Sequence, residues 1–197
     1  MVYQVSDTLK NARSLPGSQY SSESTFQSEV AQLFRQEWFP VARVDQLANS
    51  GDYLVHDHFG DEIAVVRDDS GNLNAFSNIC LHRACPILTG EGNVGGRYMS
   101  CPYHKWAYEL DGQLRGAPLM EQAEGFVVSS NKLPSVALEI WQGWVFLNLH
   151  AEAKPLAPRL AELDTKLSAF GFADLRHVET MSFSSPWNWK ILVENFL

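Results

Sequence analysis

Four residues near the middle of the sequence have the types and the spacing of metal ligands. His82 follows Cys80 after one intervening residue, and His104 follows Cys101 after two. Eighteen residues separate the two pairs. On a tight loop, the cysteine and the histidine of one pair can both turn toward a single point. We therefore expect two loops that lie side by side and together offer two thiolates and two imidazoles.

Two cofactors suit this set of donors. Zinc accepts two cysteines and two histidines in a tetrahedron. A [2Fe–2S] cluster of the Rieske type has two cysteines on one iron and two histidines on the other. Zinc fingers usually pair cysteine with cysteine and histidine with histidine, whereas each pair here is mixed. The mixed pairs favour the cluster, with Cys80 and Cys101 on the inner iron and His82 and His104 on the outer iron, and zinc remains the alternative.

The segments that must position these loops have the pattern of short strands. Between Val41 and Leu149, β-like runs alternate with turns rich in Gly, Asp and Asn. Hairpin turns are expected at 69–72, 111–112 and 142–143. We predict strands at Tyr53–Phe59, Ile63–Arg67, Leu73–Ser77, Arg97–Cys101, Trp106–Leu110, Val136–Trp141 and Trp144–Leu149.

Apolar residues at helical spacing precede this β-region. The run from Phe26 to Trp38 predicts a helix with a capping box formed by Ser24 and Gln27. Pro40 is expected to end this helix because proline cannot continue it. The β-region itself is expected to be a small antiparallel domain or barrel.

Helical spacing returns after the β-region. Leu156–Leu167 is predicted to be a helix, Val178–Phe183 could form a strand, and Pro186 is expected to open a further helix. That last pattern is still running at Leu197, so the sequence looks truncated. The predicted fold class is α+β and mainly β, with an antiparallel β-domain flanked by helices.

The composition excludes several classes of protein. Of the 197 residues, 45% are hydrophobic and 19% are charged, which is typical of a globular protein. The formal net charge of −8 disfavours nucleic acid and anionic lipid as partners. No uncharged stretch is long enough to span a bilayer, and the N-terminus has no pattern of a secretory signal. Three cysteines fit a reducing cytoplasm better than a disulfide scaffold.

The chain resembles the N-terminal part of the α (oxygenase) subunit of Rieske non-haem iron oxygenases, the ring-hydroxylating type. Cys80–Ala84 and Cys101–Pro118 resemble the two ligand-bearing boxes of that family. The entry segment Leu15–Trp38 and the stretch from Trp187 to Asn195 also resemble it. The resemblance implies a [2Fe–2S] cluster held by the four residues named above, and a domain order of 1–39 (arm and helix), 40–154 (Rieske domain) and 155–197 (start of a truncated catalytic domain).

Three further residues flank the ligands. The resemblance implies that Arg83 and Trp106 shape the rim of the cluster and a docking surface, although an ordinary surface arginine and a core tryptophan are the alternatives. Tyr103 could donate a hydrogen bond toward the cluster sulfurs or simply pack. In the Rieske proteins of respiratory complexes, a cysteine at the position of Cys85 forms a disulfide with a cysteine just before the second histidine ligand. Tyr103 occupies that second position here, so the disulfide cannot form, and we interpret Cys85 as a small buried residue.

The sequence departs from the family pattern at two positions and lacks one feature. Ala84 and Lys105 stand where the family usually has glycine. The mononuclear non-haem Fe(II) site of the family is expected only in a missing C-terminal part, so we predict no catalytic residue in this chain. The pair His56 and His58 shares a strand face, which we interpret as a solvated face rather than a metal site.

The resemblance also implies a function and partners. An NAD(P)H-dependent reductase or a ferredoxin would supply electrons, and the complete enzyme would use O₂ to hydroxylate or demethylate a small organic substrate, either aromatic or a quaternary amine. Such subunits typically form homotrimers. The alternative is a stand-alone Rieske ferredoxin, which would leave residues 1–39 and 155–197 unexplained. We expect a cytoplasmic protein with no nucleic-acid or membrane partner.

Overall fold

The computed structural model describes residues 8–150 and 152–196 and divides into two compact units. One unit contains the described residues of Met1–Leu33 and Met181–Leu197, and the other is Phe34–Thr180. The predicted boundaries near residues 40 and 154 remain a prediction. The extreme N-terminus, where the sequence has no secretory pattern, lies outside the described residues.

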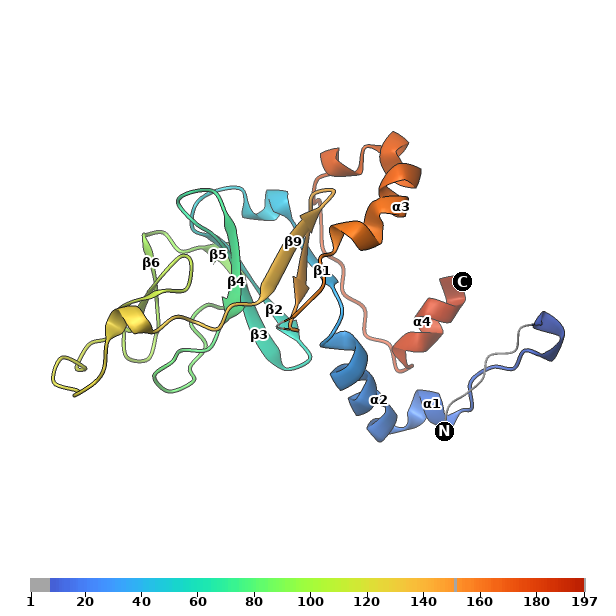
Figure 1. The fold of residues 1–197 in the computed structure, drawn as a ribbon, viewed down its shortest axis with the longest axis horizontal. Coiled ribbons are helices and arrows are strands. Elements are labelled where there is room, and N and C mark those ends of the chain that lie inside the picture. Colours follow the sequence, from blue (N-terminus) through green and yellow to red (C-terminus); the bar gives the residue numbers. More distant parts are fainter. Residues whose placement is uncertain (1–7, 151, 197) are drawn as a thin grey trace. The chain divides into compact units, whose positions relative to one another are not determined.

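The larger unit consists mainly of antiparallel strands in three small sheets (Figure 1). The first sheet has the order β1-β10-β9, the second β4-β3-β2-β5 and the third β6-β7-β8. This confirms the predicted fold class, mainly antiparallel β with few helices. The strands are β1 (Phe39–Arg43), β2 (Asp52–His58), β3 (Asp61–Arg67), β4 (Leu73–Ser77), β5 (Glu91–Asn93), β6 (Tyr98–Ser100), β7 (Ala107–Glu109), β8 (Leu114–Gly116), β9 (Ala137–Trp141) and β10 (Trp144–Asn148).

All seven predicted strands are present within one or two residues of their expected bounds, and β1, β5 and β8 were not predicted. The short strands β5 and β8 are rich in glycine and polar residues, which gives them little β-pattern of their own. The strand β1 contains Pro40, and its pairing with β10 is irregular between Pro40 and Ala42. Proline is tolerated there because β1 is an edge strand of its sheet.

Strand β3 separates two hydrophobic cores. Successive side chains of a strand point to opposite faces, and both faces of β3 are buried. Ala64 and Val66 contribute to one core, whereas Ile63 and Val65 contribute to the other. The first core also contains Cys80 and Cys101, the two cysteines predicted to be ligands, so this packing fixes the base of the predicted site. Its buried members are Ala64, Val66, Phe76, Cys80, Ile87, Met99, Cys101, Trp106, Tyr108, Leu110, Leu114, Ala117 and Leu133.

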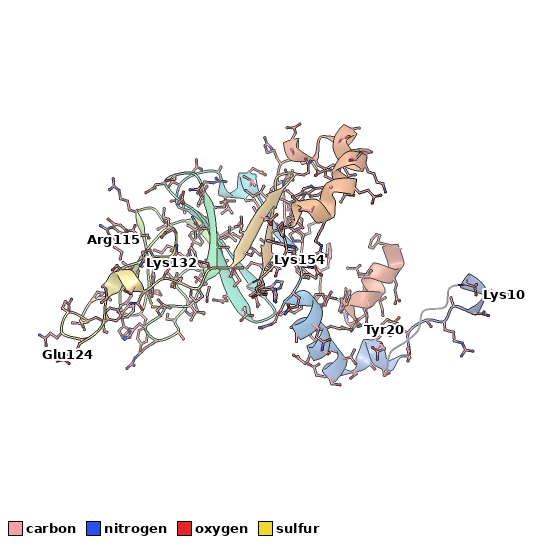
Figure 2. All side chains as sticks on the ribbon, in the orientation of Figure 1. Lys10, Tyr20, Arg115, Glu124, Lys132 and Lys154 are labelled. Carbon is pink, nitrogen blue, oxygen red and sulfur yellow. The ribbon has the colours of Figure 1, made fainter. Side chains whose placement is uncertain are left out.

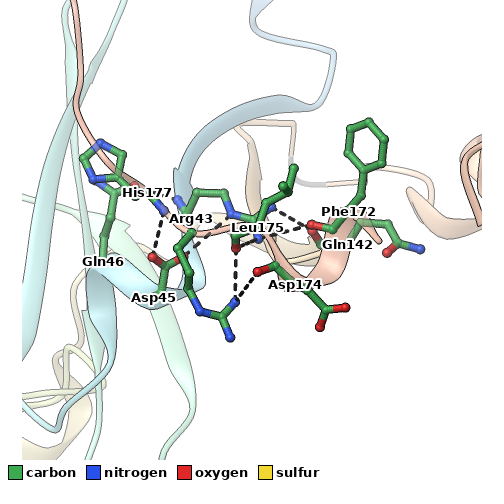
Figure 3. A network of polar contacts seen from close by, with 9 residues as sticks. Arg43, Asp45, Gln46, Gln142, Phe172, Asp174, Leu175 and His177 are labelled. Carbon is green, nitrogen blue, oxygen red and sulfur yellow. Dashed lines mark hydrogen bonds and ion pairs between the residues drawn. The ribbon is translucent and has the colours of Figure 1, made fainter. Parts of the chain in front are cut away.

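The buried side chain of Arg43, on β1, contacts the turn of the hairpin between β9 and β10. Its turn residues Gln142 and Gly143 both have positive φ values, as a tight two-residue hairpin turn requires. The guanidinium of Arg43 donates to the carbonyls of Gln142 (2.8 Å), Phe172 (3.4 Å) and Leu175 (2.5 Å), as Figure 3 shows. One side chain thus joins strand β1 to this hairpin and to the segment after α3.

The predicted helix of residues 156–167 is present as α3 (Ala157–Leu167) in the larger unit. It is held against β9 by hydrogen bonds from the Trp141 indole and the Gln142 amide to Asp164, both 2.8 Å. The remaining helical turns of this unit are Val44–Leu47, Val128–Ser130, Ser168–Phe170 and Phe172–Asp174. Val178–Phe183, which was predicted as a possible strand, has no regular structure, so that prediction was wrong.

The smaller unit contains α1 (Ser18–Ser21), α2 (Glu23–Glu29) and α4 (Trp189–Phe196), and a 3-10 turn at Leu9–Asn11. The predicted N-terminal helix exists, but its capping residue is Ser22, whose hydroxyl accepts from the amide of Thr25. The capping box of Ser24 and Gln27 was therefore wrong. A π-helical segment at Val30–Phe34 continues the helix.

The last helix begins three residues later than expected. Pro186 precedes α4, and the Asn188 side chain accepts a hydrogen bond from the amide of Lys190 at its start. Glu29 binds both Lys190 (2.6 Å) and the Trp189 indole (2.9 Å), which joins α4 to α2. Among the described residues, no helix has the length and apolar character needed to cross a bilayer.

Candidate metal centre

Two loops of the larger unit present the four predicted ligands, and their backbones follow the same hydrogen-bond pattern. In the first loop the amide of Cys80 donates to the carbonyl of Cys85 (2.9 Å), and the amide of Ala84 donates to the carbonyl of Cys80 (3.0 Å). In the second loop the corresponding pairs are Cys101 with Trp106 (2.9 Å) and Lys105 with Cys101 (3.1 Å). The two loops are therefore structural repeats of each other, although one has a single residue between its ligands and the other has two.

The repeated loop requires a left-handed residue near its end. Ala84 has a φ of 52° and Lys105 a φ of 61°. These are the two positions where the sequence departs from the glycines usual in the family it resembles. Glycine adopts this conformation freely, whereas other L-residues incur roughly 1–2 kcal/mol of strain. Ala84 and Lys105 therefore adopt the same loop geometry at a cost in conformational free energy.

The two cysteines lie together at the base of the loops. Cys80 and Cys101 are both buried, and each has the other among the groups that surround its sulfur. Desolvation acts to raise the pKa of Cys101, but the backbone amides of Tyr103 and His104 point at the sulfur and bring its pKa below the ordinary value. A thiol that ionises easily and accepts amide hydrogen bonds is suited to bind iron.

The two histidines lie together at the outer end of the loops. Their ring centroids are 4.6 Å apart, with the ring planes at 69°. His82 is exposed and His104 is half-buried. Desolvation, together with His82 and Arg83, lowers the pKa of His104. The lowered pKa favours the neutral imidazole, which is the form that binds a metal.

The flanking residues are placed as follows. Trp106 is buried, and its ring stacks on that of His82 at 4.9 Å with an angle of 10°, so it supports this imidazole from within the core. Tyr103 is 58% exposed and lies against the ring of His104, with 3.7 Å between centroids. Its ring therefore lies on the surface beside an imidazole rather than beneath the sulfurs. Arg83 is exposed at the end of the first loop.

Cys85 is half-buried rather than fully buried, and it packs against the core that contains the two ligand cysteines. Desolvation and the proximity of Cys101 raise its pKa, so it remains a thiol. Its Sγ donates to the carbonyl of Pro86 at 3.4 Å. These contacts match a packing role beside the site.

The sequence analysis missed one residue of the site, Tyr108. Its side chain is fully buried, and its hydroxyl lies 3.2 Å from the Sγ of Cys80 and accepts from the amide of Leu81 at 3.0 Å. Desolvation, with Cys80, raises the pKa of Tyr108, so the phenol keeps its proton and can donate it to the sulfur. The alternation of strand β7 was the available signal, because Tyr108 lies two residues after the inward-facing Trp106.

His56 and His58 lie outside this site, on β2. The expectation of a solvated face was wrong for His58, which is only 4% exposed. Its Nε2 lies 2.9 Å from the carbonyl oxygen of Phe34, and its Nδ1 lies 3.4 Å from Nε2 of His56. Phe39 and Phe59 contact the same ring edge-to-face. His58 is thus a hydrogen-bonded core histidine.

The donor set comprises a buried pair of sulfurs and an outer pair of imidazoles. Within the described ranges, no three His, Cys, Asp or Glu side chains form one group that could hold a metal ion. The sulfurs of Cys80 and Cys101 form one pair and the rings of His82 and His104 form another, and each loop contributes one member to each pair. Such an arrangement suits two linked irons, one with sulfur ligands inside and one with imidazole ligands at the surface.

Comparisons with known proteins agree with this chemistry. Residues 37–137 match the family model of the Rieske [2Fe-2S] domain. The chain is 33% identical over 190 residues to the carnitine monooxygenase oxygenase subunit of Escherichia coli K12, which covers 95% of this chain and 50% of that protein. It is 32% identical over 183 residues to the glycine betaine monooxygenase oxygenase subunit of Chromohalobacter salexigens, covering 92% of this chain and 40% of that protein.

A solved structure is similar over nearly the same length. The apo form of the quaternary ammonium Rieske monooxygenase CntA superposes with a TM-score of 0.88 at 29% identity, covering 94% of this chain and 54% of that one. The chain thus spans about half the length of the curated relatives it matches. The family model covers half of the chain and includes both ligand loops, so the chain belongs to the Rieske [2Fe–2S] domain family.

Proposed function

We propose that Cys80 and Cys101 bind the inner iron of the [2Fe–2S] cluster and that His82 and His104 bind the outer iron. The observation that carries this proposal is the division of the donors into a buried sulfur pair and an outer imidazole pair on two matching loops. When bound, the cluster accepts and releases one electron. The chain's own residues supply a dry, hydrogen-bonded base for the sulfurs and bring the imidazoles to the surface.

We propose further that the complete protein is the α subunit of an oxygenase. Electrons from an NAD(P)H-dependent reductase or a ferredoxin reach this domain and pass to a mononuclear non-haem iron, which lies in the half of its relatives that this chain does not span. The similarity extends over 95% of the chain, including both helical segments, which favours this function over a stand-alone ferredoxin. A homotrimer in the cytoplasm remains our prediction for the complete enzyme.

The proposed substrate class is a quaternary amine. The relatives named above act on carnitine and on glycine betaine, and CntA is a quaternary ammonium monooxygenase. An aromatic substrate was the other expectation from the sequence.

The cluster and the substrate can be tested in turn. Protein reconstituted with iron and sulfide should contain about two irons and two sulfides per chain and show the visible spectrum of a Rieske cluster. One zinc per chain without sulfide would contradict the cluster. A protein that extends this chain to the length of its relatives, supplied with a reductase and NADH, should consume O₂ in the presence of carnitine or glycine betaine. Turnover of aromatic compounds alone would contradict the substrate class.

Tyr108→Phe should lower the reduction potential of the cluster by about 20–60 mV. The hydroxyl lies 3.2 Å from the Sγ of Cys80, and a metal-bound thiolate there could only accept its hydrogen bond, which would stabilise the reduced, more negative form. A neutral hydrogen bond of about 0.5–1.5 kcal/mol corresponds to that range for one electron. A redox titration followed by circular dichroism measures the potential. Tyr98→Phe is the matched control, because the Tyr98 ring lies at the surface under Arg115. Equal potentials in the two variants would contradict the role of Tyr108.

A further inference from the structure

The entrance and the exit of the first ligand loop meet at one buried side chain, that of Asn78. We define the first loop as residues 79–87, which contain Cys80, His82 and Cys85. Asn78 follows strand β4 directly, precedes this loop, and is 0% exposed. Burial of a polar side chain is costly unless its donors and acceptors are bonded. The partners of Asn78 therefore indicate what its burial achieves.

The side chain of Asn78 is bonded at each of its polar atoms. Its Oδ1 accepts from the amide of Leu88 (2.9 Å), and its Nδ2 donates to the carbonyl of Leu88 (2.9 Å) and to Oε2 of Glu62 on β3 (3.2 Å). The backbone adds two bonds, because the amide of Asn78 donates to the carbonyl of Glu62 (2.8 Å) and its carbonyl accepts from the amide of Ile87 (2.9 Å). One residue thus joins the end of β4, the exit of the loop and strand β3.

The backbone of the first loop is only weakly paired where the loop begins and ends. In the part of the chain that the structure describes, one isolated bridge, Ile79 with Pro86, pairs the two sides. Ser77, the last residue of β4, is paired with β3 and donates its amide to the carbonyl of Pro134. The side chain of Asn78 therefore supplies to the exit of the loop the two bonds that a further pair of strand residues would supply.

The second ligand loop is closed in a different way. Its two sides are the paired strands β6 and β7. Strand β8 supports β7 on the other edge, and Arg115 on β8, labelled in Figure 2, binds Glu109 on β7 at 2.6 Å. A regular β-ladder thus holds the loop of Cys101 in place, whereas the loop of Cys80 depends on a side chain.

We propose that Asn78 is a positioning residue for the cluster, because its side chain keeps the first loop closed and so holds Cys80 beside Cys101. This inference rests on the proposed cluster ligands and adds to them the residue on which the position of Cys80 depends. Release of Leu88 from Asn78 would let the two sides of the loop separate, and the two sulfurs would separate with them. Hydrogen bonds that support ligands in this way fix the geometry of a metal site and raise its affinity.

Glu62 determines how the amide of Asn78 is oriented. Its carboxyl oxygen accepts one of the two Nδ2 hydrogens, which leaves the other for the carbonyl of Leu88. An asparagine side chain offers one acceptor and two donors from a single planar group, which is the set that these partners require. Alanine at this position would leave the amide and the carbonyl of Leu88 without these bonds.

The test compares Asn78→Ala with Asn148→Ala in the cluster-loaded chain. Asn148, the last residue of β10, is 2% exposed, and its side chain also bonds two backbone groups, the carbonyl of Gln36 (3.1 Å) and the amide of His150 (2.8 Å). Both substitutions remove a buried, hydrogen-bonded amide, so both should lower the Tm to a similar extent. Only Asn78→Ala should change the behaviour of the ligand loop.

Two rates report on the loop. Cys85 is the one cysteine that is not a proposed ligand, so its reaction with iodoacetamide in the cluster-loaded chain reports opening of the first loop. Asn78→Ala should increase this rate about 10-fold, as expected when several buried hydrogen bonds are lost. The visible spectrum should also disappear about 10-fold faster in the presence of an iron chelator, for the same reason. Asn148→Ala should leave both rates at the values of the unmodified chain.

Variants of Glu62 provide a second test, which also serves if Asn78→Ala does not fold. Glu62 is half-buried, so its substitution leaves the core intact. Glu62→Ala should increase both rates about 3-fold through the loss of one hydrogen bond. Glu62→Gln should retain the original rates, because the amide oxygen of glutamine can still accept from Asn78.

Equal rates in Asn78→Ala and Asn148→Ala proteins of similar Tm would overturn the proposal. Equal rates in Glu62→Ala and Glu62→Gln would do the same. The visible spectrum is recorded before each experiment. A missing cluster in the unmodified chain would contradict the proposed function, whereas an intact cluster with unchanged rates in the variants would contradict the role of Asn78 alone.

Discussion

Replacing Cys80 by serine or His104 by alanine should abolish the visible spectrum of the cluster and reduce the iron content from about two atoms per chain to nearly zero. Each substitution removes one ligand from a different iron in the proposed assignment. Serine is a poor iron ligand at neutral pH, and alanine has no donor atom. Absorption spectra and iron analysis after reconstitution measure the effect, with far-ultraviolet circular dichroism to verify that the variants are folded.

Cys85→Ala is the matched control for the ligand variants. Cys85 is a thiol in the same loop as Cys80, but its Sγ donates to the carbonyl of Pro86 and its pKa is raised. The spectrum and the iron content should therefore be retained. A spectrum that survives in folded Cys80→Ser protein, or that is lost in Cys85→Ala protein, would show that the cysteines have been assigned wrongly.

Arg43→Leu is expected to destabilise the larger unit by about 3 kcal/mol. The side chain is only 5% exposed and donates to three carbonyl oxygens, while its Nε lies 3.7 Å from Asp45 (Figure 3). Hydrogen bonds from a charged donor contribute about 1.5–3 kcal/mol each. The carbonyl of Gln142 would lose its donor, whereas the carbonyls of Phe172 and Leu175 would keep bonds from the amide of Leu175 (3.3 Å) and the guanidinium of Arg176 (3.1 Å). For a protein of this size the loss corresponds to a decrease in Tm of roughly 6–12 °C, measurable by calorimetry.

Two further variants delimit the effect of Arg43. Arg176→Leu removes an exposed arginine from the same region and should change the free energy of unfolding by less than about 0.5 kcal/mol. Gly143→Ala should also destabilise, because Gly143 has a φ of 76° and a Cβ there would lie 2.5 Å from Nη2 of Arg43. If Arg43→Leu were no more destabilising than Arg176→Leu, the network would not hold this region together.

The sequence predicted the two candidate ligand loops because the chemistry is local. Cysteine and histidine at short spacing have few structural uses, and the surrounding runs of β-branched and aromatic residues predicted seven of the ten strands. The hairpin turns were readable for the same reason, since residues such as Asn and Gly adopt the required backbone angles by themselves. The sequence also showed that Ala84 and Lys105 replace glycines usual in the family. It did not show that both residues adopt the left-handed backbone conformation that makes the replacement costly.

The tertiary structure decided the surroundings of the ligands. The contact between Tyr108 and Cys80 joins residues that are far apart in the sequence. Strand alternation indicated that Tyr108 faces inward, but it could not show that the hydroxyl lies beside the Sγ of Cys80. His58 is likewise buried with a hydrogen-bond partner, the carbonyl of Phe34, from a distant part of the sequence. The role of Arg43 depends on hydrogen bonds to carbonyls more than ninety residues away. Residue types and spacing thus predicted the donor set, whereas its hydrogen bonds and its exposure follow from how distant segments pack.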